Sequence, residues 1–433
     1  MLENIKSDFF AGKIKTQDLE NTVFERVYMS EPGKLNEACR AATSIRCEYL
    51  EHIAGCALPL IKGAHFDTCA LSEGRVLSGI ESKVGAASIP LGFAGPAKIH
   101  GQYISADEDI YIPLATNEAA LVAGVQRGLK AINLAGGLKT MVSFDGMSRA
   151  PLIEAPDIYE AKAFIDKIAG NTEYMAELQK CVPDPFVVLK EIEPYQLGTK
   201  VFLRLIFTTG DAMGMNGVTK AAAEICRYIL AQNPGWRLIT ISGNLCTDKK
   251  NAHINVLNGR GKSVHTEVFI PEEVLERVFK KGATSRAVEK VVFHKCYLGS
   301  ALSGTISGFN VNAANTVAAF FAATGQDLAH IVSSSSCFVQ ADAVDGGLHF
   351  MVSLPCLELA TVGGGTQFGT AKEALALIGC DSYGSSTDDN RSVKRLAEIA
   401  ATAVTALDLN TACAQAAGYE MADSHVRLAR GEK

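Results

Sequence analysis

The 433-residue sequence is informative first through what it lacks. It has no excess of positive charge, because 41 Lys and Arg stand against 47 Asp and Glu for a formal net charge of −6. Phosphate-rich partners require a basic face, so nucleic acid is excluded as the main partner. The most apolar piece, residues 316–323, is far shorter than the roughly 18–20 residues that cross a bilayer. The first twenty residues mix both charges and predict no signal peptide. We therefore expect a cytoplasmic protein without a membrane partner.

Several short motifs are also missing. None of the twelve cysteines forms C-x-x-C and there is no H-E-x-x-H, so no metal site is expected. We expect the cysteines to be small buried side chains in a reducing compartment. No G-x-G-x-x-G follows a strand-like run, which disfavours a Rossmann domain. The GRGKS segment at 259–263 is not a phosphate loop, because Val256 stands where that motif requires glycine.

The composition and the predicted secondary structure change several times along the chain. Residues 1–75 carry apolar side chains at helical spacing, and residues 78–96 are punctuated by Gly and Pro. A helix is predicted from residue 117, with Glu118 in its first turn. After residues 149–151, about 90 residues alternate strand-like and helix-like runs, which indicates a compact α+β insert. Small-residue and Ala-rich helices dominate the remainder.

Two glycine-containing segments are candidates for binding a ligand. DAMGMN, residues 211–216, joins a predicted strand to a predicted helix, where bare backbone and unpaired helix N–H groups favour a ligand. The alternative, a plain strand-to-helix turn, is equally compatible with the residues. VGGGTQFG, residues 362–369, exposes three consecutive residues without side chains, which is typical of a ligand-facing segment or a tight turn.

Four isolated polar residues are candidates for catalysis. Lys249 and its neighbour Lys250 sit in a polar loop; such pairs are usually solvated, but an ammonium aimed at a carbonyl oxygen would stabilise developing negative charge. Glu118 and Asp327 stand in apolar surroundings, which would raise the pKa of a carboxyl group and suit a proton donor. Helix capping is the alternative for both acids. His425 alone reads as a surface histidine.

Together these segments resemble the 3-hydroxy-3-methylglutaryl-coenzyme A (HMG-CoA) reductase family. The resemblance covers roughly residues 78–430 and rests on motifs that occur in order along the chain. The form of the DAMGMN and TDKK segments is similar to class I members, in a version without a membrane anchor. The motifs are IPLGFAGP, LATNEAALVAG, GMSRAP, TTGDAMGMN, ISGNLCTDKK, GRGKS, GFNVNAANTVAA, GQD, TVGGGT and SHV.

The resemblance implies a two-step reduction of HMG-CoA to mevalonate and CoA by two NADPH, through a hemithioacetal and mevaldehyde. The family's catalytic residues map onto Glu118, Lys249, Asp327 and His425. Lys249 would hold the reacting oxygen, Glu118 would supply a proton to the aldehyde, and Asp327 would bridge these two residues. His425 would protonate the departing CoA thiolate.

The resemblance also implies binding residues. An anionic substrate suits the basic residues among them, and Arg430 matches the family position near the 2′-phosphate of NADPH. The substrate-binding set is Arg127, Arg149, Ser242, Asp248, Lys250, Lys295 and Asn315. The cofactor-binding set is Asp211, Met213, Gly214, Met215, Asn216, Gly364, Gly365 and Arg430.

The implied fold is α+β. A helical N-terminal domain (1–80) precedes a large domain built around a long central helix (81–150 and 241–433). A small ferredoxin-like cofactor domain (151–240) is inserted into the large one. The family site forms between two subunits, which predicts a homodimer or homotetramer.

Departures from the family pattern at Ala86, Gly124, Gln126 and residues 101–112 weaken the assignment of the CoA contacts, but not that of the catalytic residues. The alternatives are an NAD-dependent mevalonate oxidiser, a silent CoA-binding regulator and an unrelated NAD(P) dehydrogenase.

Overall fold

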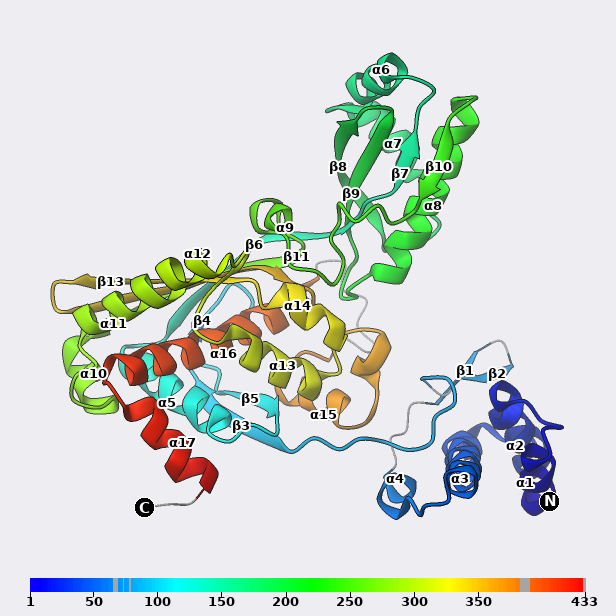
Figure 1. Ribbon diagram of the computed structural model, residues 1–433, viewed down its shortest axis with the longest axis horizontal. Helices are drawn as coiled ribbons and strands as arrows, with labels where there is room; N and C mark the ends of the chain where they lie inside the picture. The colour runs from blue at the N-terminus through cyan, green and yellow to red at the C-terminus, as the bar shows by residue number, and fades with distance from the viewer. Residues whose placement is uncertain (65–68, 73, 78, 382–389, 431–433) are drawn as a thin grey trace.

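The computed structural model describes residues 1–64, 69–72, 74–77, 79–381 and 390–430, and its helices and sheets form the predicted α+β fold. Buried apolar side chains gather in three clusters, one in each of the three parts visible in Figure 1. The first cluster lies within residues 5–76 and the second within 147–229. The largest draws on residues 94–138 and 264–413, so the second cluster interrupts it in sequence.

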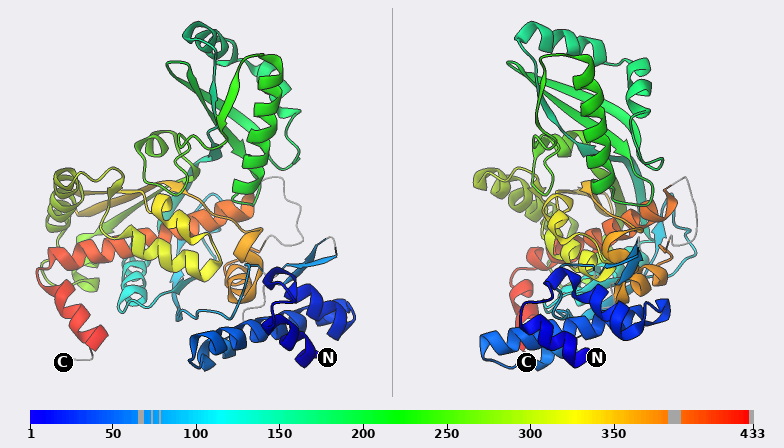
Figure 2. Two further views of the ribbon diagram at one scale, coloured as in Figure 1. Left: turned by 45° about the vertical axis from the view of Figure 1, so that its right-hand side comes forward. Right: turned by 90° about the vertical axis from the view of Figure 1, so that its right-hand side faces the viewer.

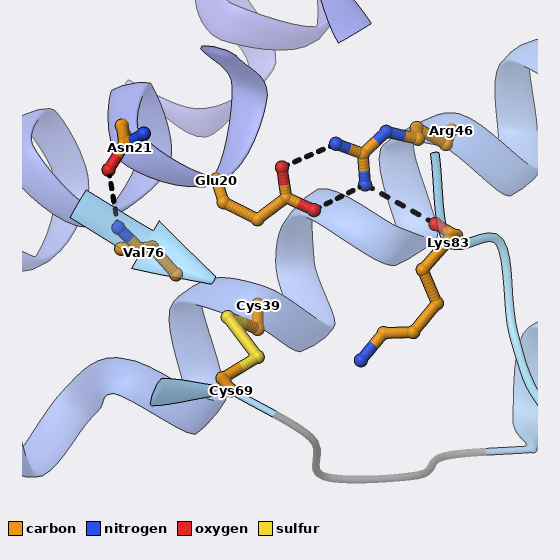
Figure 3. The surroundings of a disulfide bond; sticks show 7 residues. All are labelled: Glu20, Asn21, Cys39, Arg46, Cys69, Val76 and Lys83. Carbon is orange, nitrogen blue, oxygen red and sulfur yellow. Dashed lines mark hydrogen bonds and ion pairs between the residues drawn. A yellow bond between two sulfur atoms is a disulfide. The ribbon is translucent and has the colours of Figure 1, made fainter. Parts of the chain in front are cut away.

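The N-terminal part is mainly helical, as its apolar spacing predicts. A buried ion pair crosses it: the Arg46 guanidinium donates to both carboxylate oxygens of Glu20 and also to the carbonyl oxygen of Lys83 (Figure 3). An extended segment, residues 83–90, then leads to the main body. The helices are α1 (Leu2–Phe10), η1 (Thr16–Asp18), α2 (Leu19–Tyr28), η2 (Pro32–Lys34), α3 (Leu35–Ala54) and α4 (Pro59–Gly63).

Two expectations for this part are wrong. The helical reading of residues 1–75 missed a hairpin of β1 (Ala70–Ser72) and β2 (Arg75–Leu77), whose strands are too short to show a period in the sequence. The expectation that all cysteines are reduced fails at Cys39 and Cys69, which form a disulfide between α3 and the residue just before β1 (Figure 3). The other ten cysteines are free, and eight of them are buried.

The main body is organised by a mainly antiparallel sheet that the sequence pattern did not reveal. At its centre β11 (Gly261–Pro271) pairs with β14 (Gly347–Leu357) on one side and with β6 (Leu138–Arg149) on the other. β13 (Cys337–Val344) and β12 (Gly308–Phe309) continue the sheet beyond β14. A separate two-stranded sheet joins β3 (Leu91–Ala97) to β5 (Ile110–Ala115), and β4 (Ile99–His100) pairs with β6.

The longest helix, α16 (Arg391–Ala416), runs through this body and confirms the predicted central helix (Figure 1). Its small side chains let neighbouring elements approach closely, and it contacts α5 (Leu121–Leu134), α13 (Ala313–Thr324) and the face of the sheet. Two buried acids on it accept backbone N–H groups. Glu398 accepts from Gln102 and Tyr103, and Asp408 accepts from Val311 and Asn312.

Strand β6 connects the body to the inserted part. Its first two thirds pair with β11, and its last residues, Met147–Arg149, pair with β9. One continuous strand thus supports both parts, and the insert projects from the body as a separate lobe (Figure 2). The insert contains β7 (Leu152–Glu154), α6 (Ile158–Ile168), α7 (Thr172–Gln179), β8 (Val188–Leu197), β9 (Lys200–Thr208), α8 (Met215–Gln232) and β10 (Arg237–Thr240).

The rest of the body is mostly helical. Among the described helices, none is long and apolar enough to cross a membrane. Residues 292–299 form a π-helix, an uncommon element that often marks functional sites. The remaining elements are α9 (His253–Asn258), α10 (Glu272–Val278), α11 (Ser285–Val291), α12 (Ser300–Ser303), η4 (Leu328–His330), α14 (Ile331–Ser334), η5 (Gly364–Gln367), α15 (Gly369–Leu377) and α17 (Glu420–Arg430).

Candidate active site

The loop after β10 presents Lys249 in an unusual backbone conformation. Asn244, Thr247 and Lys249 have φ values of 62°, 47° and 58°, in the left-handed region that residues with a Cβ rarely adopt. Such conformations persist only where the surroundings hold them. Here the buried Asn255 amide donates to the carbonyl oxygen of Cys246 and to the Thr247 hydroxyl, so the loop is tied at its middle.

Lys249 pairs with Asp327, which is the lysine half of the bridge that the family resemblance implies for Asp327. The Lys249 Nζ lies 2.8 Å from Asp327 Oδ2, and both side chains remain partly exposed. Asp327 follows α13 and also accepts a hydrogen bond from the backbone N–H of Ala329 at 3.0 Å. The capping reading of Asp327 is therefore correct alongside the ion pair.

The expectation of a raised pKa for Asp327 is wrong. Burial by itself raises the pKa of this carboxyl group, but the Lys249 ammonium, the Ala329 N–H and the nearby His330 together lower it below its ordinary value. Asp327 is consequently a carboxylate at neutral pH. It is suited to holding the lysine ammonium rather than to donating a proton.

Behind this pair lies a buried charged cluster that the sequence analysis missed. Arg260, His330 and Glu358 are fully or almost fully inaccessible. The Arg260 guanidinium pairs with Glu358 and reaches Asp248 Oδ1 at 3.1 Å. The His330 Nε2 lies 2.9 Å from Asp248 Oδ1 and 3.1 Å from Glu358 Oε2. A signal existed in the charged residues within otherwise apolar or glycine-rich runs, GRGKS and LPCLELATV.

The cluster sets the ionisation of Asp248, which the sequence analysis placed in the substrate set. Burial alone raises the pKa of Asp248, but the hydrogen bond from His330 and the charges of Arg260 and Lys249 hold it far below its ordinary value. Within the described residues, ligand atoms of Asp248, His330 and Glu358 lie within 4.8 Å of one another, close enough for a metal ion. The Arg260 guanidinium already pairs with both carboxylates at that point.

The Lys249–Asp327 pair lies on the wall of a cavity of about 1050 Å³ between the insert and the body. The structure thus brings together two of the predicted catalytic residues, two predicted substrate residues and most predicted cofactor residues. The predicted residues that line this cavity are Arg149, Asp211, Met213, Gly214, Met215, Asn216, Asp248, Lys249, Asp327, Gly364 and Gly365.

The turn between β9 and α8 forms one side of this cavity. Gly214 has a φ of 91°, and a Cβ there would lie 2.3 Å from the Thr209 methyl group, so the turn requires glycine. It places the N-terminus of the 18-residue helix α8 at the cavity, where free N–H groups favour an anion. Asp211 lines the cavity, but its Oδ1 accepts the backbone N–H of Val393 and thereby caps α16.

The Gly363–Gly365 segment forms another side. A Cβ at Gly365 would lie 2.7 Å from the carbonyl oxygen of Gly325, at the C-terminal end of α13, so the two backbones are in direct contact. At Gly363 and Gly364 a Cβ would meet nothing within 4 Å. This bare backbone therefore faces open space at the cavity, next to the segment that carries Asp327.

Glu118 lies in a second, smaller cavity of about 250 Å³, together with the predicted substrate residues Arg127, Lys295 and Asn315. The helix prediction was early by four residues: α5 begins at Leu121, because residues 119 and 120 form a turn, and Glu118 precedes the helix. The Glu118 Oε1 accepts a hydrogen bond of 3.2 Å from Asn315 Nδ2. Lys295 reaches this cavity from the π-helix.

The two cavities lie at opposite ends of α13 and, among the described residues, share no lining residue. Asn315 in its first turn lines the smaller cavity, and Phe321 and Ala322 near its end line the larger one. At about 1.5 Å per residue, Asn315 in the first turn and Gly325 at the C-terminal end of this helix lie roughly 15 Å apart. One chain therefore keeps Glu118 away from Lys249 and Asp327.

The remaining predicted residues either line neither cavity or have side chains outside the part of the chain that the structure describes. Ser242 and Lys250, both described, belong to neither lining. The Lys250 ammonium donates to the carbonyl oxygen of Asp248 at 3.1 Å. His425 and Arg430 belong to α17, and their side chains lie outside the described residues.

Comparisons with known proteins agree with this arrangement. The family model for hydroxymethylglutaryl-coenzyme A reductase matches residues 42–430. The chain is 42% identical over 431 residues to the 3-hydroxy-3-methylglutaryl-coenzyme A reductase of Aeropyrum pernix, covering 99% of this chain and 96% of that protein. It is 40% identical to the same enzyme of Methanocaldococcus jannaschii, over 95% of this chain and 99% of that protein.

A solved structure has the same fold. It is the class II enzyme of Streptococcus pneumoniae bound to NADPH, with a TM-score of 0.62, 18% identity, and coverage of 86% of this chain and 96% of that chain. The family match spans the body, the insert and both cavities. The chain belongs to the hydroxymethylglutaryl-coenzyme A reductase family.

Proposed function

We propose that this protein reduces HMG-CoA to mevalonate and CoA, consuming two NADPH and two protons, in the mevalonate pathway to isoprenoids. The observation that carries the proposal is the Lys249–Asp327 pair on the wall of the larger cavity. The family membership supports the same reaction, and NADPH in the similar Streptococcus structure supports the cofactor. The form of the DAMGMN and TDKK segments supports a class I type.

The groups lining the larger cavity fit a nicotinamide dinucleotide. The α8 N-terminus offers N–H groups to a pyrophosphate, and the open glycine backbone at 363–364 allows a flat ring to approach closely. Bound NADPH supplies the hydride for each reduction. A preference for NADPH over NADH rests on Arg430, whose contact with a 2′-phosphate would be worth about 1.5–3 kcal/mol.

The chain's own residues handle charge and protons. When hydride adds to the thioester, its oxygen becomes negative, and the Lys249 ammonium, with donors left after pairing with Asp327, stabilises that charge. Collapse of the hemithioacetal releases the CoA thiolate, which His425 protonates. In the second reduction Lys249 again holds the oxygen, and Glu118 supplies the proton that completes the alcohol.

A single chain separates Glu118 from Lys249, which supports a composite site. We propose a symmetric homodimer, alone or within a tetramer, in which the smaller cavity of one subunit meets the larger cavity of its partner. The three apolar clusters support the division into domains at 1–80, 81–150 with 241–433, and 151–240. A cytoplasmic location and a ferredoxin-like insert remain part of the proposal.

The test is direct. Purified protein is mixed with HMG-CoA and NADPH or NADH, and loss of reduced cofactor is followed together with release of CoA and mevalonate. The proposal expects two cofactors oxidised per mevalonate and a higher kcat/KM with NADPH. Activity only with mevalonate and NAD would instead establish the oxidising homologue. Binding of HMG-CoA without turnover would establish the silent regulator.

A further inference from the structure

The buried imidazole of His330 is the single described side chain that approaches both acids flanking Lys249. Its Nε2 lies 2.9 Å from Asp248 Oδ1, on the loop that carries the lysine. Its Nδ1 lies 3.5 Å from Asp327 Oδ2, on the segment after α13. Asp248 precedes Lys249 in the chain, and Asp327 holds its ammonium. The ring thus spans the two supports of the lysine.

We propose that His330 is a positioning residue that holds the loop of Lys249 and the carboxylate of Asp327 at one fixed separation. This inference rests on the proposed function of that site. It assigns to His330 a role in the placement of the ammonium, without contact with substrate or cofactor.

The surroundings support this role over a purely structural one. Lys249 has a left-handed backbone, which persists only where the surroundings hold it, and the neighbouring Asp248 is one of the points at which the loop is held. Arg260 at 3.1 Å and Arg149 at 3.8 Å also contact Asp248, but neither contacts Asp327 in the interactions that the structure shows. The Nδ1 atom is buried and makes no hydrogen bond of good geometry. The position of the packed ring, rather than a strong bond, therefore sets the distance between His330 and Asp327.

The effect on catalysis should be large, because the position of the ammonium determines how well it meets the oxyanion. A misplacement of about 1 Å costs on the order of 10²-fold in rate. Substrate affinity should change little, since His330 itself is fully buried. The expected signature is therefore a loss in kcat without a matching rise in KM.

The informative variant is His330→Gln, whose amide can still donate to Asp248 and Glu358 but lacks the ring atom that faces Asp327. Its kcat for HMG-CoA should fall at least about 10-fold, while KM for HMG-CoA and NADPH stays within about threefold. The matched control is His349→Gln on β14, where the histidine makes only a surface pair with Glu267 at 3.6 Å. That control should retain wild-type kinetics.

A second measurement does not depend on activity. The acetylation rate of Lys249 is compared by mass spectrometry in wild type and both variants. A looser pair with Asp327 leaves the amine more often free to react, so His330→Gln should label faster and His349→Gln at the wild-type rate. Unchanged kcat or unchanged labelling in His330→Gln overturns the inference. An inactive wild type overturns the proposed function instead, and the labelling result then judges His330 alone.

Discussion

Complementation between two inactive variants tests the composite site most sharply. Glu118 pairs with Asn315 in the first turn of α13, whereas Asp327 follows its end and holds Lys249. The roughly 15 Å along this helix far exceeds the about 3 Å over which a proton passes between hydrogen-bonded groups. Glu118→Gln and Lys249→Ala should therefore each inactivate the protein, but in different halves of the site.

When both variants are co-expressed with different tags, random pairing places about half of the dimers in the mixed form. In a mixed dimer one composite site contains both substitutions and the other contains none. The pooled protein should therefore recover about one quarter of wild-type activity. The matched control pairs Lys249→Ala with Asp327→Asn, which alter the same half and should give no recovery. If the first pair stays as inactive as its parents, the site forms within one chain and the reasoning is refuted.

Three further predictions concern single residues. His425→Gln should lose most reduction of HMG-CoA but keep substantial reduction of free mevaldehyde, which has no thiolate to protonate; equal loss of both, measured on one preparation, contradicts the thiolate role. Burial raises the pKa of Asp408 from 3.8 to about 7, although the hydrogen bonds from the Val311 and Asn312 N–H groups lower it in part. The stability that this protonated group provides is fully present below pH 3.8 and falls by about 4 kcal/mol as pH rises from about 4 to about 7. Urea unfolding of Asp408→Asn should show a flatter fall from pH 5 to 8 than wild type, and equal slopes contradict the assignment. In Gly128→Ala the new Cβ would lie 1.9 Å from the Ala406 carbonyl oxygen, so α5 must move off α16. Its unfolding free energy should drop by about 1–3 kcal/mol, whereas Gly33→Ala, with no atom within 4 Å of its Cβ, should be neutral; similar stability of the two variants contradicts the close contact.

Sequence patterns predicted well the features that are local in the chain. The helical spacing of residues 35–54, the strand-to-helix turn at Gly214 and an Ala-rich helix in the C-terminal part all appear where they were expected. Sequence patterns failed where a structural feature depends on residues that are far apart in the chain. β11 and β14 pair residues that lie more than 75 positions apart, and the Cys39–Cys69 disulfide joins a helix to the residue just before a hairpin strand.

By itself, the sequence determined the family, the α+β class and the identities of the candidate residues, because ordered motifs carry this information without coordinates. It did not determine the ionisation of Asp327, which sequence context predicted to have a raised pKa. Only the tertiary structure brought Lys249 within 2.8 Å of this residue, and the ammonium lowers that pKa. The same holds for His330, whose partners Asp248 and Glu358 come from two segments remote in sequence. Charges interact through space, so their effects become definite only when the fold sets the distances.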